Sequence, residues 1–151
     1  MFLRPACTLA LLLALGGCQS QPQHASGHDS HVSHTDWDKA TIVRVELRDY
    51  GFDPREIRLR SGQPYRLEFF NSGGNTHYFN APEFFRAIAA HKAEVPDHAE
   101  VKAERYTQFE IMRRGGKLHF YFIPLVAGTY PFHCHLENHA QLGVEGVIVV
   151  E

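Results

Sequence analysis

The stretch Gly128–Val144, GTYPFHCHLENHAQLGV, decides how the rest of the chain is interpreted. Its first half alternates like a strand that ends at Cys134, and His139 follows five residues later, across a segment too short and polar to be another strand. A thiolate and an imidazole at one end of a β domain indicate a transition-metal site. With His77 from the segment NSGGNTHYF, the donors become one sulfur and two nitrogens, the ligand set of the trigonal copper centres that transfer electrons.

The alternation of this strand sorts its histidines into two groups. Successive side chains point to opposite faces, so Phe132 and Cys134 are expected to face the core, whereas His133 and His135 face the other way. These two histidines therefore cannot reach a metal bound by Cys134. The turn after the strand lets His139 double back toward it.

The N-terminal sequence MFLRPACTLALLLALGGC has the pattern of an export signal. Arg4 precedes an apolar run that is too short for a membrane span, and small residues follow. Its last four residues resemble a bacterial lipobox. We therefore expect residues 1–17 to be a lipoprotein signal peptide and Cys18 to be acylated, which tethers the periplasmic protein to a membrane by lipid alone. A buried core helix and a soluble secreted form cleaved near Gly17 are the alternatives.

Residues 18–38 are predicted to form a flexible tether. They are rich in Gln, Ser, Gly and His and have few apolar side chains to bury. Four histidines lie in this segment: His24, His28, His31 and His34. They belong either to a solvated linker or to a loose metal-gathering tail, since neutral imidazole suits copper, nickel and zinc.

The cysteines leave Cys134 without a disulfide partner. Cys7 lies inside the predicted signal and Cys18 would carry lipid. An unpaired thiol exported to an oxidising compartment needs protection. Metal ligation would provide it, and a buried inert cysteine is the alternative.

Residues 39–151 have the length of a single domain and contain regular strand-like runs between turn residues. The runs are 42–47, 57–59, 65–69, 107–112, 117–123, 128–134 and 146–150, with a turn expected at 49–54. They predict an all-β, Greek-key antiparallel β-sandwich. The formal net charge of -2 and the scattered Lys and Arg residues give no reason to expect nucleic acid as a partner.

One segment interrupts the β pattern. Asn80 can cap a helix that begins at residue 81 or 82 and continues to Lys92. The apolar residues at helical spacing are Phe84, Phe85, Ile88 and Ala89. We therefore expect one short helix insertion before Pro96, with His91 and His98 solvated rather than bound to metal.

The sequence resembles the cupredoxin family, the small periplasmic copper proteins similar to plastocyanin and azurin. The resemblance covers about residues 41–151, and it is carried by a Gly-containing loop before HYF, by APEFF, and by GTYPFHC with the following His and G-x-x-G. It implies a β-sandwich with a type 1 copper at one end. It also implies that His77, Cys134 and His139 are the copper ligands.

Two positions depart from the family pattern. Many members carry an axial methionine ten residues after the cysteine, where this chain has Val144, a residue without a lone pair. We therefore expect a nearly three-coordinate copper with a raised reduction potential. Tyr78 follows His77 where many relatives have an asparagine that supports the site, so the surroundings of the ligands are not predicted.

The triplet His133-Cys134-His135 also resembles the pair of histidines that flanks the cysteine in multicopper oxidases. His133 and His135 either bind a second metal, for example between subunits, or lie on a polar sheet face. The chain lacks the further HxH pairs that an oxidase cluster needs, so an oxidase or reductase assembled across subunits is the least favoured function.

Two other functions are open. One is one-electron transfer with a partner such as a cytochrome or a copper enzyme. The other is periplasmic copper handling or tolerance, in which the His-rich tail collects additional, weakly bound copper. Zinc is the competing metal, because one Cys and two His with an open fourth position also suit it.

Overall fold

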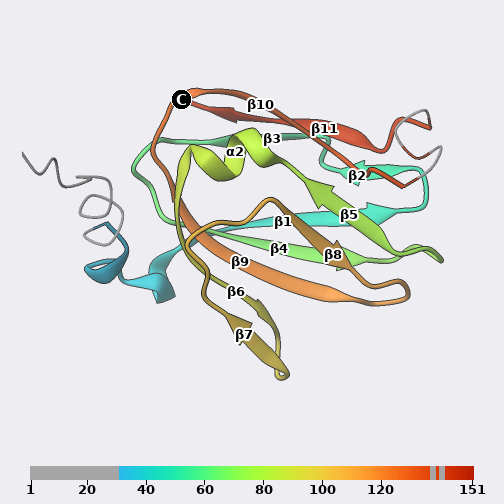
Figure 1. Cartoon of the computed structure of the whole chain (residues 1–151), viewed down its shortest axis with the longest axis horizontal. Coiled ribbons are helices and arrows are strands. Elements are labelled where there is room, and N and C mark those ends of the chain that lie inside the picture. Colours follow the sequence, from blue (N-terminus) through green and yellow to red (C-terminus); the bar gives the residue numbers. More distant parts are fainter. Residues whose placement is uncertain (1–30, 137–138, 140–141) are drawn as a thin grey trace, which may run out of the picture.

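The computed structural model describes residues 31–136, 139 and 142–151. The predicted signal peptide, the lipidation site Cys18 and the tether histidines His24 and His28 lie outside the described residues. Two β-sheets pack face to face, and a short helix, α2 (Pro82–Arg86), packs against strands of both sheets (Figure 1). Within the described part of the chain, no helix is long and apolar enough to cross a membrane.

The first sheet has six strands in the order β2-β1-β4-β9-β6-β7. Their bounds are β1 (Thr41–Arg48), β2 (Gly51–Asp53), β4 (Tyr65–Asn71), β6 (Ile88–Val95), β7 (Ala99–Val101) and β9 (Lys117–Pro124). Strands β1 and β4 run parallel, and every other neighbouring pair is antiparallel.

The second sheet has five strands in the order β3-β11-β10-β5-β8. Their bounds are β3 (Glu56–Leu59), β5 (His77–Asn80), β8 (Gln108–Ile111), β10 (Gly128–His133) and β11 (Glu145–Val150). Strands β3 and β11 run parallel, and the other pairs are antiparallel. The predicted all-β sandwich is therefore confirmed, with one parallel pair in each sheet that the sequence did not indicate.

An aromatic core joins the two sheets. Alternating residues of the strands point inward, and the fully buried phenylalanines are Phe69, Phe79, Phe84, Phe120, Phe122 and Phe132. The rings of Phe79 in β5 and Phe132 in β10 lie 4.8 Å apart, and such pairs contribute about 0.5–1.5 kcal/mol beyond their burial. Because His77 begins β5 and Cys134 follows β10, this contact links the two strands that position these candidate ligands.

The predicted helix is present but shorter than expected. Helix α2 spans Pro82–Arg86, and residues 88–95 form strand β6 instead of continuing it. The prediction was wrong there because apolar residues at helical spacing also suit a strand when a partner is available, and β6 pairs along β9 from Ile88↔Pro124 to Glu94↔His119. Asn80 makes no side-chain cap; its amide contacts His133 instead.

The end of the predicted tether contacts the domain. A short 3-10 helix, η1, spans Trp37–Lys39, and the Trp37 ring stacks on His91 with centroids 4.5 Å apart and an interplanar angle of 3°. His91 is therefore half-buried rather than fully solvated, and its pKa is lowered by burial and then by the charges of Lys102 and Lys92. His98 is exposed, as expected.

Candidate metal centre

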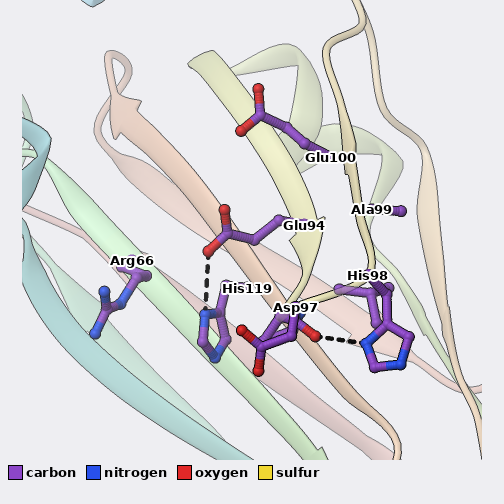
Figure 2. Close-up of a pocket in the computed structure, with 9 residues that line it drawn as sticks. Arg66, Glu94, Asp97, His98, Ala99, Glu100 and His119 are labelled. Carbon is purple, nitrogen blue, oxygen red and sulfur yellow. Dashed lines mark hydrogen bonds and ion pairs between the residues drawn. The ribbon is translucent and has the colours of Figure 1, made fainter.

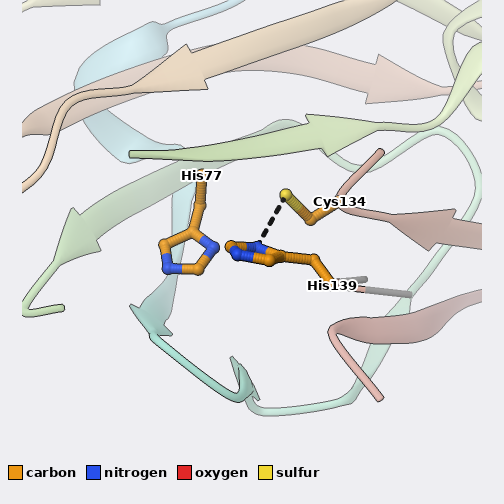
Figure 3. Close-up of side chains that lie close together, drawn as sticks. All are labelled: His77, Cys134 and His139. Carbon is orange, nitrogen blue, oxygen red and sulfur yellow. Dashed lines mark hydrogen bonds between the residues drawn. The ribbon is translucent and has the colours of Figure 1, made fainter. Parts of the chain in front are cut away.

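The structure brings His77, Cys134 and His139 together at one end of the sandwich (Figure 3). One candidate ligand atom from each residue lies within 4.8 Å of the other two. Cys134 Sγ lies 3.5 Å from His139 Nδ1, and the two imidazole rings have centroids 5.0 Å apart. His77 begins β5, Cys134 follows β10, and His139 lies in the turn before β11, so three separate chain segments converge.

His77 has the strongest need for a ligand. Its side chain is 0% exposed, and neither ring nitrogen has a hydrogen-bond partner among the residues that the structure describes. A buried polar group without a partner is costly, so such groups in native proteins nearly always have one. Burial, and then the neighbouring His139, lower the pKa of His77, which favours the neutral imidazole that binds metals. The orphaned nitrogens and the donor types therefore fit a bound metal ion.

Cys134 is a free, fully buried cysteine held by two backbone contacts. Its own N–H donates to the carbonyl oxygen of Val144 at 2.9 Å. Its Sγ accepts a hydrogen bond from the backbone N–H of Tyr78 at 3.4 Å. The residue after His77 therefore contacts the sulfur through its backbone amide.

The turn after β10 returns the chain to the cluster through backbone hydrogen bonds. The His139 N–H donates to Leu136 O at 3.0 Å, and the His139 carbonyl accepts from the N–H groups of Leu142 at 3.1 Å and Val144 at 3.0 Å. Gly143 has a φ of 80°, a conformation that glycine adopts without strain. Val144, the residue at the expected axial position, is fully buried.

The loop before His77 is anchored by Asn71 at the end of β4. The buried Asn71 amide donates to the carbonyl oxygens of Asn75 and Ile111, both at 2.9 Å, and its oxygen accepts from the Gly73 N–H at 2.9 Å. Asp49, in the turn between β1 and β2, accepts from Gly74 and Asn75 and places Oδ1 3.7 Å from His77 Nε2.

Sequence reasoning did not identify Asp49, Asn71 or the Tyr78 amide as parts of this site. The polar, glycine-rich run after Asn71 marked a loop but gave no sign of what would anchor it. Asp49 belongs to a segment predicted only as a turn, and its contact with His77 joins loops that are far apart in sequence.

His133 and His135 do not join the cluster. His133 Nε2 contacts the Asn80 amide nitrogen at 3.0 Å, while the exposed His135 packs its ring against Tyr78 with centroids 4.3 Å apart. The predicted strand phase is confirmed, because Phe132 and Cys134 are fully buried. No second cluster of three metal donors occurs among the residues that the structure describes.

A separate polar pocket lies beside β6 and β9 on the outer face of the six-stranded sheet (Figure 2). Its most enclosed carboxylate, Glu94, is already paired with Lys92 at 2.7 Å, with Tyr121 at 2.8 Å and with His119 at 3.4 Å. These contacts form a structural charge network rather than an open ligand site.

Solved structures place this architecture in one class. Auracyanin from Roseiflexus castenholzii aligns with a TM-score of 0.53 at 20% identity, covering 74% of this chain and 98% of that protein. The McoA multicopper oxidase from Aquifex aeolicus aligns with a TM-score of 0.56 at 14% identity, covering 80% of this chain but 31% of the oxidase. The chain has the cupredoxin fold, and its buried Cys and His donors form a candidate metal site at one end of that fold.

The sequence has a relative that extends along almost its whole length. It is 29% identical over 165 residues to the copper-resistant cuproprotein CopI of Rubrivivax gelatinosus, covering 98% of this chain and 96% of that protein. No protein-family model matches the sequence.

Proposed function

We propose that the protein binds one copper ion through His77, Cys134 and His139 and carries single electrons. The observation that supports this most directly is the convergence of a cysteine sulfur and two imidazoles, one of them a fully buried histidine with no hydrogen-bond partner in the described part of the chain. Copper bound there supplies one-electron redox chemistry.

The surroundings of the donors favour rapid electron exchange. The Tyr78 amide supports the sulfur, backbone hydrogen bonds set the turn that carries His139, and Asn71 anchors the loop before His77. Because these contacts are made by the protein's own backbone and side chains and do not depend on the metal, little rearrangement should accompany a change in oxidation state.

Val144 stands where many cupredoxins carry an axial methionine, and its side chain would offer a bound copper no donor atom. It is fully buried, and the donor cluster found among the described residues has three side chains. The absence of a thioether should favour Cu(I) and raise the reduction potential. Copper also accepts trigonal coordination by one thiolate and two imidazoles, whereas zinc held by the same three donors would take a fourth ligand such as water.

The optical spectrum of the copper-loaded protein tests the metal assignment. Adding Cu(II) to the purified mature chain should produce an intense visible band from thiolate-to-copper charge transfer, and Cys134→Ala should abolish it. His133→Ala, which removes a histidine next to the cysteine but outside the cluster, should keep the band. A colourless Cu(II)-loaded protein, or tighter binding of zinc than of copper, contradicts the assignment.

Electron transfer requires a separate measurement. The copper-loaded protein should show reversible voltammetry and exchange electrons with a c-type cytochrome, the kind of redox partner we propose. A site that cannot be reoxidised after reduction refutes the carrier function while leaving the copper site intact.

Copper tolerance is the second candidate function, and the relationship to CopI favours it. Here the protein would bind excess copper outside the cytoplasm, with the tether histidines adding weaker sites. Deleting residues 19–36 should then reduce the number of copper ions bound per chain and the copper tolerance of the host, while the visible band persists. Unchanged binding and tolerance would exclude a role for the tail.

We further propose that the protein is an exported lipoprotein. The N-terminal pattern that ends at Cys18 supports this assignment. Cys18→Ala should move the protein from the membrane fraction to the soluble fraction, whereas Cys7→Ala should not. Membrane association that persists in Cys18→Ala would refute the lipid anchor.

A further inference from the structure

An acidic side chain lies behind the most deeply buried ligand candidate. Asp49 Oδ1 is 3.7 Å from His77 Nε2. No other ion pair joins His77 to an acidic residue among the described residues. The carboxylate comes from the turn between β1 and β2 and is not a member of the three-donor cluster.

This carboxylate is held in place by N–H donors. Its Oδ2 accepts from the Gly74 N–H at 3.2 Å, and its Oδ1 accepts from the backbone and side-chain N–H groups of Asn75 at 3.0 and 3.1 Å. Three N–H donors therefore fix the position of the carboxylate beside the His77 ring.

The loop sequence permits the close approach. A Cβ built on Gly73 would lie 2.6 Å from Asp49 Oδ1, closer than real Cβ atoms come to their neighbours. Glycine at this position is therefore needed for the carboxylate to reach the loop and the His77 ring. The position of Asp49 therefore depends on two segments that are distant in sequence, the turn that contains Asp49 and the loop at residues 73–75.

The chemistry of an imidazole gives this position a consequence. A histidine that binds metal through one nitrogen carries its proton on the other, and a carboxylate near that N–H fixes the tautomer and makes the ligand more basic. With Nε2 toward Asp49, Nδ1 is the nitrogen left to face the cluster, and one ring nitrogen points toward His139 in Figure 3.

We propose that Asp49 is a positioning residue that holds His77 as the Nε2–H tautomer and adds negative charge behind it, which strengthens Cu(II) binding relative to Cu(I). This inference rests on the proposed copper site. It also predicts that the two residues shift the reduction potential in opposite directions, because Val144 favours Cu(I) and Asp49 favours Cu(II).

The charge and the loop contacts of Asp49 can be separated by substitution. Asp49→Asn removes the charge and keeps one acceptor oxygen, whereas Asn75→Ala removes one loop donor and keeps the charge. Asp53→Asn is the matched control, because Asp53 lies on the same hairpin but pairs with Arg48 at 3.1 Å.

The test measures Cu(II) and Cu(I) affinities of the purified mature protein by competition with chelators. Asp49→Asn should lower the Cu(II) affinity by about 10–100-fold, the usual effect of removing such a partner, and should lower the Cu(I) affinity less. The reduction potential should rise accordingly. Asp53→Asn and Asn75→Ala should leave the ratio of the two affinities near that of the wild type. An equal effect in either one would overturn the inference.

A second measurement needs no copper. Nitrogen-15 NMR of the wild-type apoprotein should show His77 as the Nε2–H tautomer, and Asp49→Asn should reduce its population. A wild-type His77 protonated on Nδ1 refutes the inference even if the variant does not fold. Failure of the wild type to bind copper would instead refute the proposed function, so the two failures are distinguishable.

Discussion

Replacing Asn71 with alanine should destabilise the domain and loosen the metal centre together. The Asn71 side chain makes three hydrogen bonds within the fold, two donated and one accepted, and it is fully buried. Each contributes about 0.5–1.5 kcal/mol net, so their loss should lower the free energy of unfolding by about 2–4 kcal/mol. That is a large part of the roughly 5–15 kcal/mol typical of a domain.

Urea unfolding of the apoprotein measures this loss, and Asn80→Ala provides the control. Asn80 is half-buried, and its side chain makes one contact, with His133, so its replacement should cost about 1 kcal/mol or less. Asn71→Ala should also weaken copper binding, because the loop before His77 loses its anchor. If Asn71→Ala is no more destabilising than Asn80→Ala, the assignment of Asn71 as the anchor is wrong.

Three further changes test other parts of the structure. Val144→Met should lower the reduction potential by offering a thioether donor. A potential equal to or higher than that of the wild type, measured by voltammetry, would contradict the proposal that the valine raises the reduction potential. Gly146→Ala should lower the free energy of unfolding in urea by about 1–3 kcal/mol, because the new Cβ would lie 2.3 Å from the backbone oxygen of Arg55. Gly74→Ala should lower it less, because the nearest atom to a Cβ at that position, Asp49 Oδ2, is 3.5 Å away. The apoprotein should lose stability as the pH falls below about 6.5. Burial lowers the pKa of His77 from the 6.5 of a free imidazole, so below that pH the unfolded state binds more protons than the folded state. His77→Gln should make the free energy of unfolding less dependent on pH, and an unchanged slope in this variant would argue against the role of His77.

Most strands were predictable from alternation because each has one face in the core. The runs at 42–47, 65–69, 117–123 and 146–150 differ from the observed strands by one or two residues at their ends. Strand β6 was missed because its apolar residues also fit a helix, and only pairing with β9 decides between the two. Strand β2 was missed because three residues within a turn carry no period of their own.

In the candidate site, too, features set by one short segment were predictable, and features set by contacts between distant segments were not. The spacing of Cys134 and His139 is local, so it was readable from one segment. His77 could be chosen from its loop and the family resemblance. Asp49 and Asn71 act through contacts between loops, and no periodicity reports such contacts.

Trp37 is a fluorescent probe of the edge of the domain. It is the only tryptophan in the chain, and it lies on His91 and the edge of Tyr121 rather than in the phenylalanine core. The segment that contains η1, drawn in blue, lies at the opposite end of the sandwich from the start of β5 and the end of β10 (Figure 1). Intrinsic fluorescence should therefore record the release of residues 31–39 from the sheet, and a transition at this fluorophore can precede the loss of the core.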